Sequence, residues 1–428
     1  MLLVYTNKIS DRLNYIFHFI LKEQLGIEFM FSTNIEECKL SDKDLINYSN
    51  ESINNARFQI KPYTLLFEEG IKPQQIDCFE TDGYKAFFKT SASDFQFDIF
   101  AASFYLLSRY EEYLPHEKDI YGRYSHENSL AFKNNFLHKP LINIWINDLT
   151  LRLKTAFKNI IFHPPVFKAI LTYDIDIAWS YQHKGFFRNI GGFIKNPGLE
   201  RLSVMLRIKK DPFDAYDFID KIHEQKQLSV LYFFLVADNV SKYDKNISPN
   251  KASMRELIKA HSNKYPIGLH PSWKSNNNIT ILKKEKAYLE EIANKQILNS
   301  RQHYIQFSLP DSFEKLIKAG INNDFSMGYG SINGFRASFA GSFYWYNLAA
   351  EKMTRLKLFP FCFMDANSHY EQHQNTKDAF AELMHYKNEC EKVNGLFISI
   401  FHNNFLGTDK KFNGWKEMYE AFISQLPQ

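Results

Sequence analysis

The chain has 428 residues, which at roughly 150 residues per domain suggests two or three domains and is long enough to bury a full core. Apolar residues make up 45% of the chain and charged residues 23%, an ordinary globular composition that excludes a disordered or fibrous protein. The net charge of +4 is too small to indicate a nucleic-acid-binding protein.

The N-terminus predicts a short strand followed by an amphipathic helix, with Ser10 as the N-cap and Gly26 as the stop. The apolar positions of this helix recur at helical spacing: Leu13, Ile16, Phe17, Ile20 and Leu21. The segment lacks the charged start, unbroken apolar core and cleavage site of an export signal, and no apolar stretch approaches the ~20 residues of a membrane span. The four cysteines show no CxxC pair or metal-ligand spacing. We therefore expect a cytoplasmic protein with reduced thiols.

A second helix is predicted from Phe97 to Leu107, where apolar residues again recur at helical spacing. It leads into three charged residues, Arg109, Glu111 and Glu112. These side chains could form a site, but ion pairs on the surface of a helix are the favoured interpretation.

The sequence His163-Pro164-Pro165 interrupts both helix and strand patterns and stands directly before a new apolar run. This break predicts a domain boundary. We expect residues 1–160 to form a smaller α/β or α+β N-terminal module of unknown role and residues 166–428 to form a second domain, each of a usual domain size.

Within the second domain, short apolar runs alternate with helix-like stretches, which is typical of βα units. The seven runs cover residues 169–176, 228–238, 265–270, 296–301, 320–326, 358–365 and 396–402. Each run ends in, or closely precedes, a residue able to do chemistry: Asp174 and Asp176, Asp238, His270, Arg301, Asp324, Asp365 and His402. In a parallel α/β barrel the carboxyl ends of the strands open onto one mouth, so we expect a (β/α) barrel of about seven strands. A doubly wound sheet, which would gather such residues at one switch point, is the alternative.

Asp174 and Asp176 lie two positions apart at a strand end, so both can point into the mouth. Two carboxylates that lie so close to each other repel, and a divalent cation or an arginine relieves the repulsion. Each candidate residue is ambiguous alone. Together, aspartates, histidines and an arginine on successive strand ends are the groups that metal-assisted hydrolysis requires.

The motifs TYDID, GLH, RQHY, DFSMGY and FHNN resemble, in this order, the five motifs of the polysaccharide deacetylases, the NodB-homology domain of carbohydrate esterase family 4. The resemblance covers residues 166–428 and implies a deformed seven-stranded (β/α) barrel. It also implies a metal-dependent hydrolase that removes acetyl groups from an N-acetylated sugar of a surface or envelope glycan. The first 160 residues resemble an uncharacterised module that precedes such domains in some bacterial proteins.

The resemblance also implies the roles of individual residues. Asp174 is the expected general base, and Arg301 is expected to hold it in place. His402 is the expected general acid, with Asp324 expected to orient it. Four aromatic residues beside the motifs are candidates for stacking on sugar faces, although ordinary packing explains each equally well: Trp273, Tyr304, Tyr329 and Phe335.

The metal site departs from the family pattern at one position. Asp176 and His270 match two metal ligands, but the family's second histidine, four residues after the first, is replaced here by Lys274. An ammonium group cannot bind a cation unless it loses its proton. Because catalytic zinc sites usually keep three protein ligands, His303 is the candidate for the third ligand, with zinc as the expected metal.

This departure leaves other functions open. A catalytically inactive, deacetylase-like carbohydrate-binding or assembly module is the first alternative, because Lys274 could weaken or abolish the metal site. A hydrolase that acts on a non-sugar amide is the second.

Residues 184–211 form a long insertion with seven basic and two acidic side chains, interleaved with aromatic and aliphatic ones. Such a stretch could form a lid over the barrel mouth, or it could make peripheral contact with an anionic membrane, which would place the protein at the inner membrane face. A solvated connection with local packing is an equal alternative.

Overall fold

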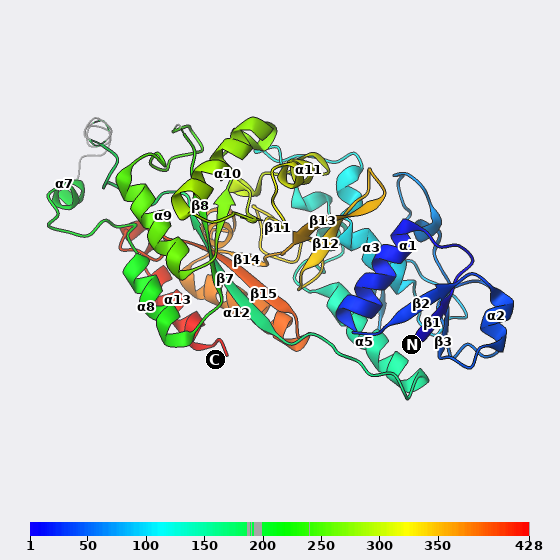
Figure 1. Cartoon of the computed structure of the whole chain (residues 1–428). Helices are drawn as coiled ribbons and strands as arrows, with labels where there is room; N and C mark the ends of the chain where they lie inside the picture. Colours follow the sequence, from blue (N-terminus) through cyan, green and yellow to red (C-terminus); the bar gives the residue numbers. More distant parts are fainter. Residues whose placement is uncertain (186–188, 190, 192–198, 239, 428) are drawn as a thin grey trace.

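The computed structural model describes residues 1–185, 189, 191, 199–238 and 240–427 and places two main sheets, built largely of parallel strands, side by side (Figure 1). The N-terminal residues form the smaller sheet and the C-terminal residues the larger one. Both sheets are accompanied by helices, so the fold is mixed α/β. In the described part of the chain, no helix is both long enough and apolar enough to cross a membrane.

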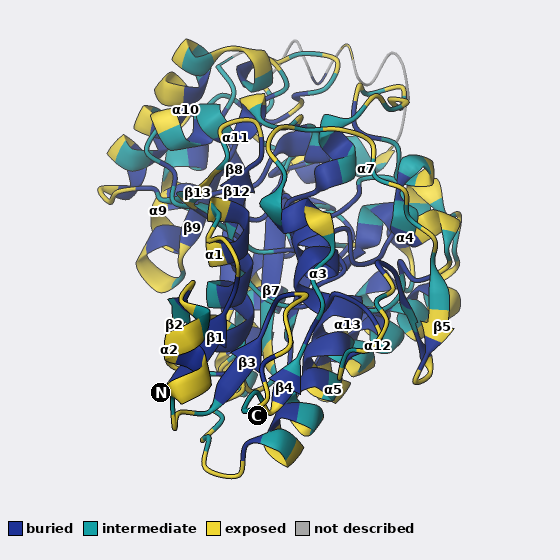
Figure 2. Cartoon of the chain, turned by 90° about the vertical axis from the view of Figure 1, so that its right-hand side faces the viewer, coloured by how far each residue is buried: buried dark blue, intermediate teal, exposed yellow. Residues whose placement is uncertain are grey.

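The N-terminal sheet has four parallel strands in the order β2-β1-β3-β4. Its helix α1 begins as the sequence predicts, because the Ser10 side chain accepts a hydrogen bond from the backbone N–H of Leu13. The main elements are β1 (Leu2–Tyr5), α1 (Asp11–Phe17), β2 (Phe29–Ser32), α2 (Ile35–Leu40), β3 (Leu45–Asn47), β4 (Phe58–Gln59), the hairpin β5 (Phe79–Thr81) and β6 (Tyr84–Ala86), α3 (Ile99–Leu107), α4 (Leu130–Lys133) and α5 (Leu141–Ala156). Every residue of α3 is buried (Figure 2), so this helix forms the centre of the N-terminal region.

The larger sheet has nine strands in the order β12-β13-β11-β10-β9-β8-β7-β15-β14. All neighbouring pairs are parallel except β12 and β13, which are antiparallel. The strands are β7 (Lys168–Ile175), β8 (Val230–Leu235), β9 (Ile267–His270), β10 (Asn299–Ser300), β11 (Asn323–Asp324), β12 (Phe343–Asn347), β13 (Lys352–Leu358), β14 (Phe363–Met364) and β15 (Leu396–His402). The accompanying helices are α7 (Leu199–Met205), α8 (Tyr216–Lys226), α9 (Ala252–Lys264), α10 (Ile279–Ala293), α11 (Asp311–Lys318), α12 (Thr376–Lys392) and α13 (Trp415–Ser424).

The strand order agrees with the expected architecture only in part. The last strand, β15, pairs with the first, β7, along its whole length, which is how a barrel winds and is unlike a doubly wound sheet. The sheet has nine strands where seven are expected. Among the described residues, no ladder joins the edge strands β12 and β14. The structure therefore shows a wound parallel sheet, and not a closed seven-stranded barrel.

The sequence pattern misses two strands, β12 and β13, and exposure explains only β13, since β12 (FYWYN) is aromatic and largely buried. The sequence of β13 is KMTRLKL, and its first four residues are largely exposed, so it has no apolar run. It pairs with β11 on one side and with β12 on the other, at the edge of the sheet nearest the N-terminal region. The hydroxyl of Tyr15 in α1 donates a hydrogen bond to the carbonyl of Tyr344 in β12 at 2.8 Å. This edge therefore serves as a contact surface for the N-terminal region.

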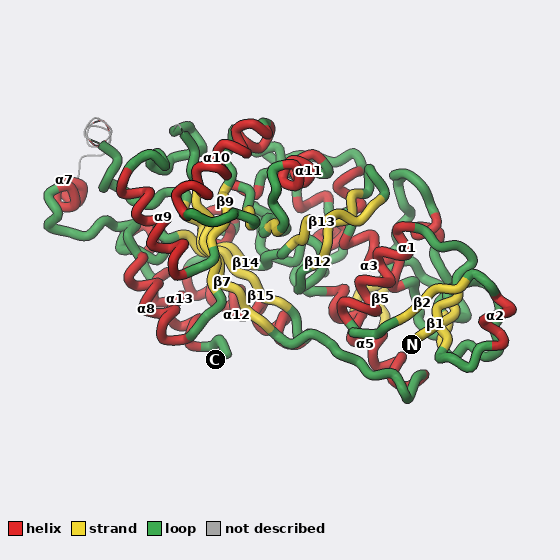
Figure 3. Tube along the Cα trace, viewed as in Figure 1, coloured by secondary structure: helices red, strands yellow, loops and turns green. Residues whose placement is uncertain are grey.

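A continuous apolar core joins the two regions. Buried Asn143 in α5 bonds the backbone of Ala340 through both of its amide atoms, at 3.2 and 2.8 Å. The loop between α5 and β7, which contains the predicted boundary at residues 163–165, runs from one region to the other (Figure 3). The division at residues 160–166 stays a prediction, since the contacts between the two parts are extensive.

The charged residues after α3 are buried, so the expectation of surface ion pairs is wrong. Arg109, Glu112 and Arg336 are each at most 5% exposed. Glu112 accepts hydrogen bonds from both arginines at 2.6–2.8 Å. Burial would raise the pKa of Glu112, but Arg336 and Arg109 hold it at about 2. Removing one member of such a buried network typically costs about 3–5 kcal/mol, so these residues fasten the N-terminal region to the larger sheet.

Part of the basic insertion at 184–211 lies outside the described residues, namely 186–188, 190 and 192–198. Its described part includes α7, which Figure 1 shows at the left edge of the molecule, away from both sheets. Five large apolar side chains of this part are exposed: Leu199, Leu202, Met205, Leu206 and Ile208.

Candidate active site

A cavity of ≈ 580 Å³ lies at the carboxyl ends of the strands of the larger sheet. Its lining includes Asp174, Asp176, His270, His303 and His402. The turn that carries His303 and the end of β15 are four strand positions apart, about 19 Å in a flat sheet. Both histidines nevertheless lie within 3.6 Å of one carboxylate oxygen, so the sheet curves strongly and brings the strand ends together.

Asp176 is the centre of this arrangement and faces three imidazoles. Its Oδ1 lies 3.0 Å from Nε2 of His270. Its Oδ2 lies 3.4 Å from Nε2 of His303 and 3.6 Å from Nε2 of His402. Oδ1 is buried and accepts no well-directed hydrogen bond from a described residue, although Nε2 of His270 lies close enough for an ion pair. A cation bound between this oxygen and the imidazole would give both atoms a partner.

Three residues of this cluster fit a divalent cation. Ligand atoms of Asp176, His270 and His303 all lie within 4.8 Å of one another. The far ring nitrogen of each histidine is held: Nδ1 of His270 by the carbonyl of Arg301 at 2.5 Å, and Nδ1 of His303 by Asp244 at 3.2 Å. Such contacts fix the ring so that Nε2 faces the cluster, as is usual for metal-binding histidines.

The negative charge of Asp176 and the imidazoles beside it shift each other's pKa values. Burial would raise the pKa of Asp176, but the imidazoles of His303 and His270 hold it well below its ordinary value. Burial would lower the pKa of His303, yet Asp176 and Asp244 raise it to about 9. Asp176 is therefore an anion, and His303 must release a proton before it can bind a metal.

Lys274 does not enter the cluster. Its side chain is exposed, and it lies outside the residues that line the cavity. It stands directly before the short helical turn at Ser275–Asn277, and its side chain makes no capping bond there. The departure from the family motif therefore removes a histidine without placing an ammonium group in the site.

Asp174 is fixed by Arg301, as expected for a base held in one orientation. Nη1 of Arg301 donates to Oδ1 of Asp174 at 2.8 Å and to the hydroxyl of Thr172 at 2.7 Å. Nε of Arg301 donates to the carbonyl of Phe325 at 3.0 Å, and the guanidinium lies 4.4 Å from the ring centre of Phe233. Arg301 and Asp174 are at most 2% exposed, so the pair is rigid and largely dry.

The partner of His402 is Asp365, which corrects the expected role of Asp324. Oδ1 of Asp365 lies 2.6 Å from Nδ1 of His402, and Oδ2 accepts the backbone N–H of His402 at 2.7 Å. Burial would lower the pKa of His402, but Asp365 raises it to about 10. The imidazole is therefore protonated at neutral pH, with Nε2 directed at the cavity.

Asp324 is buried behind the site and bonds to serines. It accepts hydrogen bonds from the hydroxyl of Ser300 at 2.8 Å and from the backbone and hydroxyl of Ser326 at 2.9 and 3.0 Å. Asp365 takes the place beside His402 because β14 and β15 are neighbouring parallel strands whose ends coincide. Asp324 lies at the end of β11, which is separated from β15 by four other strands of the sheet.

Two of the four predicted sugar-stacking residues lie at the site and two do not. Tyr304 lines the cavity, and Trp273 packs edge-on against it with ring centres 5.7 Å apart. Tyr329 and Phe335 are each 2% exposed, so their expected substrate role is wrong. Arg109 donates to the hydroxyl of Tyr329 at 3.2 Å, which places this ring in the buried contact with the N-terminal region.

Sequence reasoning assigned no role to several residues that lie in or beside the site. Asp365 was visible as a polar residue at a strand end, but the motif order pointed to Asp324. Asp244 and Tyr243 come from the irregular segment after β8 and carry no periodic signal. Tyr121 and Arg123 belong to the N-terminal region, whose chemistry the sequence did not reveal.

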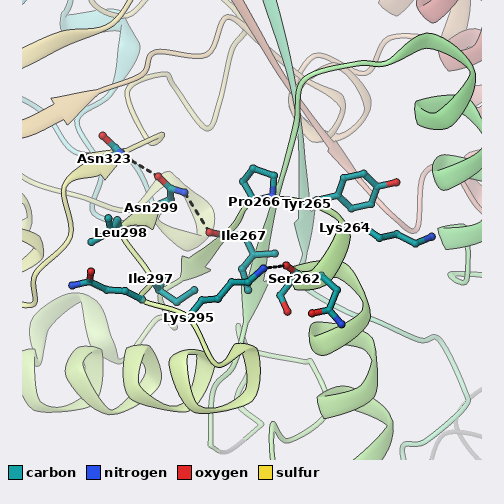
Figure 4. Close-up of a pocket in the computed structure, with 12 residues that line it drawn as sticks. Ser262, Lys264, Tyr265, Pro266, Ile267, Lys295, Ile297, Leu298, Asn299 and Asn323 are labelled. Atoms are coloured by element: carbon teal, nitrogen blue, oxygen red, sulfur yellow. Dashed lines mark hydrogen bonds between the residues drawn. The ribbon is translucent and has the colours of Figure 1, made fainter.

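A second cavity, of ≈ 450 Å³, lies at the opposite ends of the strands (Figure 4). Several of its polar side chains are already paired: Asn323 donates to Asn299 at 2.9 Å, and Lys295 donates to the carbonyl of Ser262. None of the described residues that line it is acidic or a histidine.

Residues 2–158 match a family of unknown function, DUF7033. The sequence matches no curated protein. Among solved structures, the chain is similar at 12% identity to a protein from Mycobacterium smegmatis assigned as a polysaccharide deacetylase, with a TM-score of 0.38 over 61% of this chain and 86% of that one. It is similar at 12% identity to the polysaccharide deacetylase of Bacillus cereus, with a TM-score of 0.30 over 60% and 86% of the two chains. A mutant of a carbohydrate esterase family 4 pseudoenzyme with restored activity is 10% identical, with a TM-score of 0.33 over 61% and 64%. Because these scores are low, function must be argued from the site itself.

Proposed function

We propose that this chain is a metal-dependent hydrolase that removes an acetyl group from an N-acetylated sugar of a surface or envelope glycan. The observation that carries the proposal is that three units meet at one cavity. They are the cluster of Asp176 with two histidines, the Asp174 carboxylate held by an arginine, and the His402 imidazole held by a carboxylate. These three units correspond to a metal site, a general base and a general acid. Ion pairs that only stabilise the fold do not require a cavity beside them, whereas these residues line one.

Asp176, His270 and His303 are the residues that would hold the ion, and zinc is the metal that a mixed carboxylate and imidazole set favours. A bound divalent cation would polarise the amide carbonyl and make a water molecule more acidic. The exposed position of Lys274 supports this assignment, because its ammonium group does not reach the three ligands.

The remaining residues can carry the proton transfers of amide hydrolysis. Asp174 accepts the proton of the attacking water, and Arg301 keeps its carboxylate aimed at the cavity. As the C–N bond breaks, Nε2 of His402 gives its proton to the leaving amine, while Asp365 stabilises the imidazole through Nδ1. The products are acetate and the free amino sugar. The backbone N–H of Tyr304, next to His303, is the proposed donor to the developing oxyanion.

Release of acetate tests the proposal. The zinc-loaded protein should release acetate from chitooligosaccharides faster than from simple amides such as acetanilide, and Asp174→Asn should lower kcat by at least about 10²-fold because no base remains. Preference for the simple amides would favour a non-sugar hydrolase. A protein that contains no metal, and whose Asp176→Ala form binds sugars as the unchanged chain does, would instead be an inactive carbohydrate-binding or assembly module.

We also propose that the segment 199–210 makes peripheral contact with a membrane, which would place the enzyme at the cytoplasmic face where lipid-linked glycans are made. Exposed Leu206 and Ile208 alternate with exposed Arg207 and Lys209, the composition of a segment that rests on anionic lipid. Figure 1 shows α7, which belongs to this segment, at the edge of the molecule.

Vesicle sedimentation tests the contact. The double change Leu206→Glu and Ile208→Glu should reduce binding to vesicles rich in phosphatidylglycerol by at least about tenfold, because it removes apolar contact and adds two negative charges. Leu151→Glu is the matched control, since Leu151 is a similarly exposed leucine in α5. Equal binding by both variants and the unchanged chain would discard the membrane contact.

A further inference from the structure

The N-terminal region contributes a wall of the cavity, although its family carries no known function. Tyr121 and Arg123, from the turn at residues 119–123, line the same cavity as the candidate catalytic groups. They lie about 50 residues from the sequence position of the first catalytic motif, on the far side of the predicted domain boundary. The cavity is therefore incomplete without the N-terminal region.

The turn is held rigidly against the larger sheet. Oδ1 of Asp119 accepts the backbone N–H groups of Tyr121 and Arg123 at 2.9 and 3.0 Å. The side chain of Gln306 donates to the carbonyl of Tyr121 at 2.9 Å across the two regions. These bonds place the Tyr121 ring at the cavity without a cost in ordering the loop when a ligand binds.

Arg123 ties this turn to the residues beside the metal cluster. Nη1 of Arg123 donates to the carbonyl of Tyr304 at 2.8 Å, and Nε pairs with Asp119 at 2.6 Å. Tyr304 has a φ of +59°, a conformation that a tyrosine rarely adopts without support. Gly330 makes the approach possible, because a Cβ at this position would lie 2.0 Å from Nη1.

Four partly exposed aromatic rings meet at this side of the cavity. Tyr121 lies 5.3 Å from Tyr304 and 6.3 Å from Trp273, measured between ring centres. Tyr243 stacks on Trp273 at 3.9 Å. Rings that are only partly buried beside a polar cavity present both a flat apolar face and a polar group, a hydroxyl in tyrosine and an N–H in tryptophan, which suits the face of a pyranose ring.

We propose that the turn at residues 119–123 is part of the substrate site, with Tyr121 stacking on a sugar that neighbours the acetylated one and Arg123 positioning Tyr304. The substrate is therefore an oligosaccharide or polysaccharide of at least two sugars, and the N-terminal region is a specificity element. This inference rests on the proposed deacetylase function and assigns that site a longer ligand.

Chitooligosaccharides of one to five sugars, with the full-length zinc-loaded protein, test the role of Tyr121. Tyr121→Ala should raise KM for the longer sugars about tenfold more than it raises KM for the monosaccharide, while the zinc content stays that of the unchanged chain. Tyr121→Phe should restore most of the affinity, because the ring face remains. Ile120→Ala is the matched control: this neighbour in the same turn is 91% exposed and outside the cavity.

Sugar binding, measured by the change in tryptophan fluorescence, distinguishes failure of the proposed deacetylase function from failure of the proposed role of Tyr121. If the unchanged chain neither binds nor hydrolyses any of the sugars, the deacetylase function and the role of Tyr121 both fail. If it acts on them and Tyr121→Ala keeps the KM of the unchanged chain at every length, only the inference about the turn is overturned. An equal effect of Ile120→Ala would likewise overturn it, since that side chain cannot reach the ligand.

The positioning role of Arg123 has its own readout. Arg123→Ala should lower kcat even for the monosaccharide, because it frees the backbone of Tyr304 next to His303, whereas the main effect of Tyr121→Ala should be on KM for the longer sugars. Gly330→Ala should reproduce the effect of Arg123→Ala by displacing the guanidinium. If both variants show unchanged kcat with a stable fold, the contact to Tyr304 has no role in positioning.

Discussion

Replacing His303 with alanine is expected to lower the zinc affinity of the protein more than about 100-fold, while Lys274→Ala leaves it unchanged. The physical reason is that Nε2 of His303 faces Asp176 across 3.4 Å, and Lys274 points into solvent. Losing one of three ligands costs more than losing a supporting contact, which alone is worth about 10–100-fold in metal affinity.

Zinc content after dialysis against a graded set of chelators measures this effect. Thermal unfolding of the metal-free proteins is the companion control, because His303 is buried and its removal could disturb the fold. Unchanged zinc affinity in His303→Ala would show that the chain does not replace the missing ligand in this way. A loss of affinity in Lys274→Ala would mean that this side chain, and not His303, serves the metal.

The sequence predicts the strands that carry the site better than it predicts the sheet as a whole. Each of the seven runs contains a strand. The long strands β7, β8 and β15 are found because buried parallel strands need apolar residues on both faces, whereas β10 and β11 are two-residue polar strands. The strand β13 lies near the edge and is partly exposed, so its lysines and arginine hide it from such a pattern. Closure of a barrel depends on pairing between strands distant in the sequence, about which local patterns say nothing.

The candidate site shows the same division. Residues at strand ends, such as Asp176, His270 and His402, were identified because strand geometry alone sends them to one edge. Residues on irregular segments, such as Asp244 and Tyr121, were not, because their positions depend on contacts between separate parts of the chain.

The pairing of strands identifies the partner of His402 better than the order of motifs does. Motif order predicts Asp324, but two side chains meet only if their strands are neighbours or the sheet curves between them. Asp365 satisfies this condition, since β14 pairs with β15. Burial also cannot be inferred from residue type: Tyr329 and Arg109 look like surface residues in sequence, yet each satisfies the other inside the protein.

Experiment can distinguish the role of the Asp365 carboxylate from that of the Asp324 carboxylate. His402→Ala should lower kcat for acetate release by about 10²–10⁴-fold, the usual contribution of a positioned general acid. Asp365→Asn should lower kcat by about 10²-fold, because an amide cannot hold His402 in its charged form as the carboxylate does. Asp324→Asn should leave kcat within a factor of about 3 and instead lower the free energy of unfolding by about 1–3 kcal/mol, since its amide group would face the serine donors that the carboxylate now satisfies.

Steady-state acetate release and urea denaturation, measured on the same preparations, distinguish these effects. Asp365 and Asp324 are both fully buried, so loss of a buried carboxylate alone should affect the stability of the two variants to a similar degree. Only a group in contact with the proton donor should change kcat at full folding. If Asp324→Asn lost as much activity as Asp365→Asn while its unfolding curve stayed unchanged, the role implied by the motif order would return to Asp324, and the contact between Asp365 and His402 would be merely structural.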